Sequence, residues 1–159
     1  MFDLTRKEIA GLERFGFKKI YSVEGLKEGT FFEAKDPNSV RLRAGREKLF
    51  LIHSYDPDIA MIKAVGESGA AFVLSLNEPI RGRGVERAIL LSKQRFFLSL
   101  CRKYGAQYVL CSLANDEFEA RTTKECVSIG MLLGLTYEQA CASLERLPNL
   151  LGEKNESDP

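Results

Sequence analysis

The alternation of two apolar periodicities along the chain constrains its fold more than any other feature. Short apolar runs such as 48–53 and 107–113 predict buried strands, whereas longer runs with a period near 3.6, such as 85–104, predict amphipathic helices. Strands and helices that alternate in this way are typical of a largely parallel sheet covered by helices. The sequence therefore predicts an α/β fold.

One domain accounts for the length of the chain. Its 159 residues match the size of an ordinary single domain, and no linker, internal repeat or low-complexity stretch divides them. The expected strands are 2–4, 19–24, 30–34, 40–43, 48–53, 71–76 and 107–113, and the expected helices are 6–15, 57–67, 85–104, 123–133 and 137–147. We expect residues 1–151 to form one α/β domain and the acidic segment 152–159 to be a disordered tail.

Capping sequences mark the starts and ends of several helices. The spacing of a capping box occurs three times, at Thr5–Glu8, Thr122–Glu125 and Thr136–Gln139. Asp56 followed by Pro57 has the pattern of an N-cap with proline at the first helical position. Glycines that suit left-handed helix ends stand at positions 16, 69, 105 and 134.

The residue content argues against several classes of protein. Cys101, Cys111, Cys126 and Cys141 lie in apolar sequence without a Cys-x-x-Cys pair, and the chain has one histidine. We therefore expect reduced thiols in the core, and no metal or cofactor bound by this chain. The start of the chain has no apolar signal sequence, and no long apolar run follows it, so we expect a cytoplasmic protein that does not enter a membrane.

Positive charge gathers between residues 77 and 105, although the formal net charge of the chain is only +1. This stretch holds seven Lys or Arg and two Glu, whereas a solvated helix face usually mixes both signs of charge more evenly. The excess predicts contact with RNA or with an acidic protein surface, and a simple solvated face is the alternative. Gly82 and Gly84 also flank Arg83 directly before a helix N-terminus, where backbone amides can hold a phosphate.

On the expected helix 85–104, basic and apolar residues separate onto different sides. At 100° per residue, one stripe holds Arg87, Leu91, Arg95, Leu98 and Arg102. The opposite side holds Ile89, Leu90, Phe96, Phe97 and Leu100. We expect the first stripe to face a polyanionic partner and the second to pack in the core.

Candidate catalytic residues at the ends of the strands, where parallel α/β folds place their active sites, are few. We interpret His53 as a structural or interface residue and Asp56 as the cap of the next helix. Asn115–Glu119 could hold an acid and base pair, but its acids precede the helix start at Thr122, where the helix dipole favours negative charge. Arg121 lies at the same helix start, so its charge needs a nearby acid or a phosphate.

Residues 49–151 resemble ribonuclease P protein component 3, the barrel-shaped protein subunit of archaeal and eukaryotic ribonuclease P. The resemblance is carried by the order and spacing of LFLIHS, AFVLSL, ERAILL, RKYG, VLCSLA and GMLLGLTYEQA, with Pro79 and Arg121 between them. The N-terminal FDL and GFKKI are also similar to the first two strands of that family.

This resemblance implies a TIM-barrel-like fold of the PHP type that has lost its metal site. It also implies a non-catalytic subunit of an endoribonuclease: the RNA removes the 5′ leaders of precursor tRNA, and this chain, paired with ribonuclease P protein component 2, stabilises that RNA. Mg²⁺ would then serve the RNA of the holoenzyme. We predict that the ribonuclease P RNA is bound by Arg81, Arg83, Arg87, Arg95, Arg102 and Arg121.

The length of the chain departs from the family. An eight-unit barrel usually has at least about 200 residues, whereas six or seven strands are recognisable here. The missing material falls between Glu24 and Lys48, so we expect a reduced and incomplete barrel with an open edge in this region.

Two other functions remain open from the sequence. A small metal-dependent phosphoesterase would hold a divalent metal through Asp3, His53 and Asp56. A protein–protein interaction module would instead dock the basic helix on an acidic protein, without contact to RNA.

Overall fold

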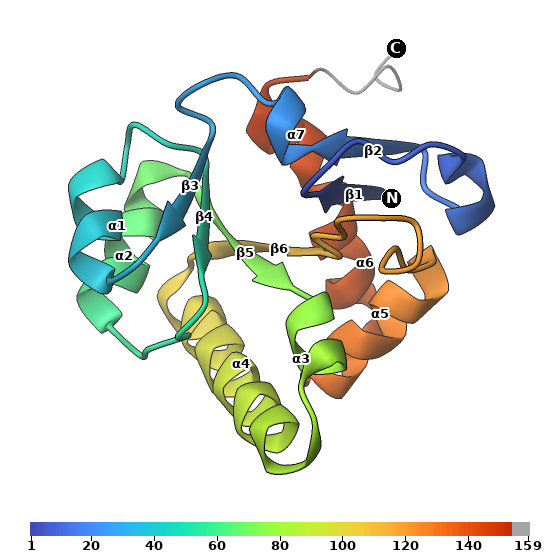
Figure 1. Cartoon of the computed structure of the whole chain (residues 1–159). Helices are drawn as coiled ribbons and strands as arrows, with labels where there is room; N and C mark the ends of the chain where they lie inside the picture. Colours follow the sequence, from blue (N-terminus) through green and yellow to red (C-terminus); the bar gives the residue numbers. More distant parts are fainter. Residues whose placement is uncertain (154–159) are drawn as a thin grey trace.

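The structure is a computed structural model, and it describes residues 1–153. Six parallel strands form the centre of this part of the protein (Figure 1). β1 (Phe2–Thr5) pairs with β2 (Lys19–Ser22), and β3 (Phe31–Ala34), β4 (Leu49–Ile52), β5 (Ala71–Ser75) and β6 (Gln107–Cys111) pair in chain order. The chain beyond β6 joins the two sheets, because the Leu113 N–H donates to the Leu4 carbonyl and the Arg6 N–H to the Ala114 carbonyl, each at 2.9 Å. The strands therefore follow the order β2-β1-β6-β5-β4-β3.

The strands do not close into a barrel. Among the described residues, the outer edges of β2 and β3 pair with no further strand. Residues 23–30 connect these two strands and hold only the 3-10 turn Val23–Gly25, which is too short for the helical crossover that joins adjacent parallel strands. The predicted α/β fold with an incomplete barrel is confirmed, and β3 forms an open edge inside the region 24–48.

Helices cover the outside of the strands. They are α1 (Pro37–Arg43), α2 (Ile59–Ser68), α3 (Asn77–Arg81), α4 (Gly84–Tyr104), α5 (Thr123–Leu132), α6 (Tyr137–Glu145) and α7 (Leu147–Leu151). α1 and α2 pack together beside β3 and β4, α4 packs on α2 and β6, and α5 and α6 pack on each other (Figure 1). The helix expected at 137–147 is α6, which ends at Glu145, whereas α3 and α7 were not predicted. No helix within residues 1–153 is long and apolar enough to cross a membrane.

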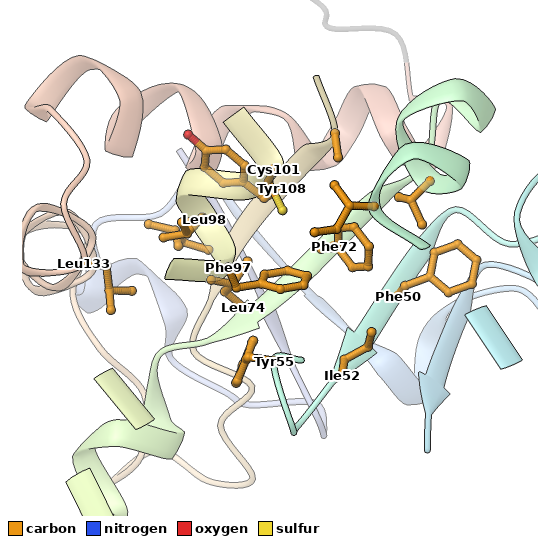
Figure 2. Close-up of a cluster of buried hydrophobic side chains, with 14 of the residues drawn as sticks. Phe50, Ile52, Tyr55, Phe72, Leu74, Phe97, Leu98, Cys101, Tyr108 and Leu133 are labelled. Atoms are coloured by element: carbon orange, nitrogen blue, oxygen red, sulfur yellow. The ribbon is translucent and has the colours of Figure 1, made fainter. Parts of the chain in front are cut away.

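Both faces of the strands are buried, which explains their uninterrupted apolar sequences. Phe50 and Phe72 pack in the larger cluster beneath the helices, whereas Leu49 and Val73 pack on the opposite face. The ring of Phe97 from α4 meets that of Phe72 edge to face, with centroids 4.9 Å apart and an interplanar angle of 82° (Figure 2). The cysteines are free thiols, buried at Cys101, Cys111 and Cys126 and partly buried at Cys141.

The helix expected at 6–15 is wrong, because only a 3-10 turn at Leu12–Phe15 forms. Thr5 does not cap a helix. It lies in β1, and its hydroxyl lies 2.7 Å from the Lys7 carbonyl and 3.1 Å from the Tyr21 carbonyl of β2. Gly11 then adopts a left-handed backbone with φ of 72°, which an α-helix does not allow.

The short strand expected at 40–43 is also wrong, since these residues belong to α1. The Asp36 carboxylate accepts a hydrogen bond from the Ser39 N–H at 2.9 Å, and Pro37 stands at the first helical position. This pair is the same start signal that the sequence offers at Asp56.

The other capping predictions are confirmed with one exception. Thr122 and Thr136 both form complete capping boxes. Asp56 does not cap α2; Asp58 does, and its carboxylate accepts from the Met61 N–H at 2.7 Å. Left-handed glycines follow α2, α4 and α5 at Gly69, Gly105 and Gly134.

The predicted tail begins at residue 152, and its residues 154–159 lie outside the described residues. The carboxylate of Glu153 accepts hydrogen bonds from Lys19 Nζ at 2.8 Å and from the Tyr21 hydroxyl at 2.7 Å. The chain is therefore attached to β2 as far as Glu153.

Candidate nucleic-acid interface

A short turn joins α3 to α4 and carries the first predicted RNA-binding arginines. Arg81 ends α3, and Arg83 directly precedes α4. Arg87 fixes this turn, because its Nε donates to the Gly82 carbonyl at 2.8 Å and its Nη2 to the Ile80 carbonyl at 3.1 Å. The glycines that flank Arg83 thus belong to an ordered turn at the N-terminus of a 21-residue helix, as their position before a helix start predicted.

α4 buries a face that only partly matches the one expected, since Phe97 and Leu100 are buried as predicted. Leu98, expected on the outer stripe, is fully buried, whereas Ile89 and Phe96, expected in the core, are 53% and 55% exposed. Gln94 accounts for the difference, since its buried amide donates to the Ser75 carbonyl at 3.0 Å and lies on the face that packs against the sheet. Apolar character alone gave the wrong phase, because apolar residues occur on both sides of this helix.

The basic residues of α4 lie at the surface without carboxylate partners. Arg87, Arg95 and Arg102 are all exposed, and none of them forms an ion pair within residues 1–153. Arg102 Nη1 donates to the Gly134 carbonyl at 3.4 Å and to the side-chain oxygen of Gln139 at 3.3 Å. These contacts orient the guanidinium group and leave its charge in place.

Arg81 and Arg121 both contact the segment that follows β6. Arg81 forms an ion pair with Glu119. Arg121 Nη1 donates to the carbonyl oxygens of Phe118 at 3.0 Å and Ala120 at 2.9 Å. The charge of Arg81 is therefore balanced by a carboxylate. Arg121 forms no ion pair within residues 1–153, but a carboxylate lies near it, since the bonds from Thr122 and then the charge of Arg121 lower the pKa of Glu125.

Asn115–Glu119 does not present an acid and base pair. Glu119 Oε2 accepts from the backbone N–H of Asn115 at 2.8 Å and from its side-chain amide at 3.0 Å. Burial acts to raise the pKa of Glu119, but these bonds and Arg81 outweigh it, and the pKa falls below its usual value. The carboxylate stays ionised and organises its own segment.

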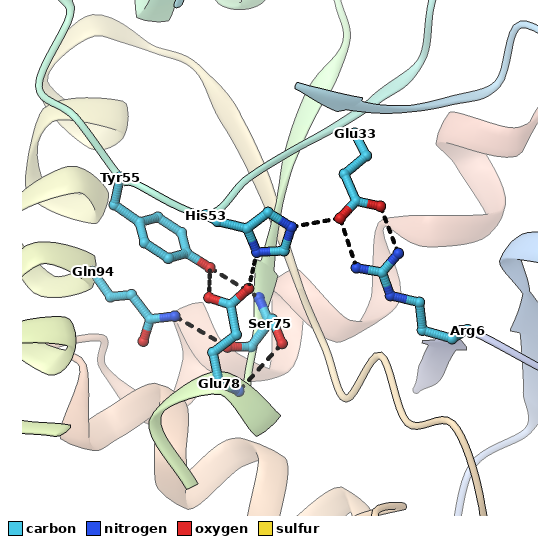
Figure 3. A network of polar contacts seen from close by, with 7 residues as sticks. All are labelled: Arg6, Glu33, His53, Tyr55, Ser75, Glu78 and Gln94. Carbon is cyan, nitrogen blue, oxygen red and sulfur yellow. Dashed lines mark hydrogen bonds and ion pairs between the residues drawn. The ribbon is translucent and has the colours of Figure 1, made fainter. Parts of the chain in front are cut away.

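His53 lies between two glutamates at the carboxyl ends of the strands (Figure 3). Its Nε2 is 2.5 Å from Glu33 Oε1, and its Nδ1 is 2.5 Å from Glu78 Oε1. Arg6 donates to both oxygens of Glu33, at 2.6 and 3.0 Å, and the Tyr55 hydroxyl donates to Glu78 at 3.0 Å. His53 thus joins segments that follow or belong to β1, β3, β4 and β5, which agrees with its interpretation as a structural residue.

The charges of this cluster follow from its geometry. The bonds from Arg6 lower the pKa of Glu33 to about 2. Burial acts to lower the pKa of His53, but its bonds to Glu33 and Glu78 outweigh burial and raise the pKa. Only a protonated imidazole can donate from both ring nitrogens, so His53 is a cation in this arrangement.

Sequence reasoning did not single out Glu33 or Glu78. Glu33 is the third residue of the four in β3, and Glu78 lies just beyond the end of β5. His53 drew attention because it is a polar residue at the carboxyl end of a parallel strand. The same criterion would have identified Glu33 and Glu78.

Asp3 is fully buried and bound within the fold. Its Oδ1 accepts from the N–H groups of Ser112 at 2.7 Å and Leu4 at 2.9 Å, and its Oδ2 accepts from the Ser112 hydroxyl at 2.5 Å. Asp3, His53 and Asp56 were the ligands of the metal-dependent alternative. Within residues 1–153, no group of three or more His, Cys, Asp or Glu side chains is arranged to hold a metal ion.

Curated proteins of one name match the chain, whereas no protein-family model does. Ribonuclease P protein component 3 of Methanosarcina acetivorans is 32% identical over 99 residues, which are 62% of this chain and 41% of that protein. The proteins of the same name from Methanococcoides burtonii and Thermococcus gammatolerans are 28% and 30% identical, over 68% and 61% of this chain and 47% and 45% of their own lengths. The chain resembles ribonuclease P protein component 3.

The similarity to ribonuclease P protein component 3 confirms the resemblance that the motifs of residues 49–151 indicated. The chain spans less than half the length of these curated relatives. An open array of parallel strands with helices outside it is compatible with a reduced barrel.

Proposed function

We propose that this chain is a protein subunit of ribonuclease P that binds and stabilises the catalytic RNA. The similarity to ribonuclease P protein component 3 is the observation that carries the proposal. The exposed arginines of α4 support it, because contacts of Lys and Arg with phosphates dominate affinity for nucleic acids. In this function the RNA cleaves the 5′ leaders of precursor tRNA, and the chain contributes no catalytic residue.

The predicted arginines differ in what they offer to a phosphate. The side chains of Arg83 and Arg95 form no hydrogen bond or ion pair inside the described part of the chain, so their guanidinium groups can bind phosphate oxygens with two parallel hydrogen bonds. Three more keep their charge and unused donors although they contact carbonyl or amide oxygens: Arg87, Arg102 and Arg121. Arg81 contributes least, because Glu119 balances its charge.

The proposal extends to the partners of the RNA. Ribonuclease P protein component 2 is the expected protein partner, and precursor tRNA is reached through the RNA. Mg²⁺ serves the RNA, and the chain holds no cofactor of its own. Residues 1–151 act as one domain in this complex.

Exposed apolar residues on α4 favour a protein contact as a second function beside RNA binding. Val85, Ile89 and Phe96 are 74%, 53% and 55% exposed. At 100° per residue they fall within one narrow arc of the helix. An apolar stripe at the surface, flanked by Lys93 and Arg95, suits an acidic protein segment.

Purification of the protein from its native cells, with sequencing of the RNA that accompanies it, tests the proposal. We expect one structured RNA, and we expect the purified complex to cleave precursor tRNA. Treatment with ribonuclease before the final step separates the two functions. Partners that remain attached to α4 after treatment indicate protein docking, whereas absence of any structured RNA from the untreated complex contradicts the proposed function.

A further inference from the structure

An aromatic side chain stands free in solvent beside the proposed RNA-binding arginines. Phe118 is 83% exposed and follows β6, at the carboxyl ends of the strands. An isolated apolar side chain at the surface is common, so its exposure alone indicates nothing. The structure around Phe118 makes the difference.

The backbone that carries Phe118 is fixed on both sides. The Asp116 carboxylate accepts from the N–H of Phe118 at 2.9 Å and from the N–H of Glu119 at 3.1 Å. Arg121 donates to the Phe118 carbonyl at 3.0 Å, and the side-chain amide of Asn77 donates to the Glu119 carbonyl at 3.0 Å. A ring that is held out by an ordered backbone loses little conformational entropy when it binds a partner.

Near Phe118, the cation of Arg121 and the carboxylate of Asp116 form no ion pair within residues 1–153. Glu117 pairs with Arg14, and Glu119 pairs with Arg81. One oxygen of the Asp116 carboxylate accepts two backbone N–H groups, and the group keeps its charge. Arg121 bonds to carbonyl oxygens, and its charge adds to the bonds from Thr122 that lower the pKa of Glu125. A partner that meets Phe118 therefore finds cationic Arg121 next to the ring.

The ion pair between Arg81 and Glu119 joins this segment to the turn between α3 and α4. Phe118 and Arg83 are thus displayed by two segments that contact each other. An aromatic anchor for a protein pocket is usually surrounded by further apolar residues, whereas the neighbours of Phe118 in the chain are Glu117 and Glu119.

We propose that Phe118 stacks on an unpaired base of the bound RNA, with Arg121 beside the phosphate of the same nucleotide. This inference rests on the proposed function, because it needs an RNA partner. Unstacked bases are recognised by exposed aromatic rings, and one such stacking contact contributes binding free energy that does not depend on counterion release.

Titration of the full chain with the ribonuclease P RNA of its own cells tests this inference through three variants. Phe118→Ala and Phe118→Leu should each bind about tenfold more weakly, whereas Phe118→Tyr, which keeps the ring, should bind as the wild type does. The slope of log affinity against log salt should be unchanged in all three, because stacking releases no counterions. Circular dichroism checks that these exposed substitutions leave the fold intact.

The outcomes separate this inference from the function on which it rests. Wild-type protein that fails to bind the RNA overturns the proposed function. Wild-type binding with an unaffected Phe118→Ala variant overturns only the stacking contact. A Phe118→Leu variant that binds as tightly as the wild type also overturns it, because the side chain would then be a generic apolar anchor.

Discussion

Replacement of Asp3 by Asn should stabilise the protein at neutral pH. Asp3 is fully buried, and desolvation raises the pKa of its carboxyl from 3.8 to about 6, against the bonds from Ser112 and Leu4. The folded state therefore binds the proton more tightly than the unfolded state. Below pH 3.8 both states are protonated and the group has no effect; stability falls as the pH rises from there to about 6, and the full penalty applies above.

The rise of the Asp3 pKa from 3.8 to about 6 lowers the unfolding free energy of the wild type by about 3 kcal/mol at pH 8. An Asn side chain at position 3 keeps an oxygen for the N–H groups of Ser112 and Leu4, and its amide can donate to the Ser112 hydroxyl. Asp3→Asn should therefore lose the charge penalty, but the buried Ser112 hydroxyl loses the Asp3 Oδ2 acceptor, so the net gain at pH 8 is smaller than the charge penalty alone.

Urea unfolding of both proteins between pH 4 and pH 8 measures this difference. We expect the gain in unfolding free energy of Asp3→Asn to grow with pH and to level off above about pH 6. Asp36→Asn, at the exposed cap of α1, is the matched control for the loss of a carboxylate at the surface. A variant that is less stable than the wild type at pH 8 would refute the reasoning.

Three further predictions concern stability. His53→Gln should destabilise the protein most below pH 6.5, because the raised pKa of His53 keeps the imidazole charged there. The loss of unfolding free energy should fade as the pH rises through that raised pKa. Unfolding curves of the two proteins from pH 5.5 to 9 that differ equally throughout would contradict this prediction. Phe97→Ala should cost about 3–5 kcal/mol, and its exposed neighbour Phe96→Ala should change stability little; similar losses for both would show that the burial of α4 is assigned wrongly. Thr122→Ala should cost about 1 kcal/mol in a thermal melt, and Thr122→Ser should restore it if the capping hydroxyl is the cause.

The strands and their parallel arrangement were predictable because β4 and β5 are apolar on both faces, which leaves a continuous signal in the sequence. The absence of the helix expected at 6–15 was not predictable in the same way. Thr5 has the spacing of a cap, but it lies in β1 and pairs with Ser22 of β2, and this pairing exists only after the chain folds. Local signals of this kind are overridden by tertiary structure.

The polar residues show a similar division. The exposed arginines of α4 could be read from the excess of positive charge in 77–105. The cluster around His53 could not, because its bonds to Glu33 and Glu78 span 20 and 25 residues of sequence and depend on the order of the strands. The phase of α4 failed at Gln94, a polar residue whose burial depends on a single backbone carbonyl of β5.

The salt dependence of affinity for ribonuclease P RNA tests the central claim most directly. Simultaneous replacement of Arg83, Arg95 and Arg102 by Ala should make the slope of log affinity against log salt less steep by about 2 to 3, because each lost phosphate contact removes about 0.7 to 0.9. Arg46→Ala, an exposed arginine between α1 and β4, is the matched control and should leave the slope unchanged. A triple variant whose slope equals that of the wild type would contradict RNA binding through α4.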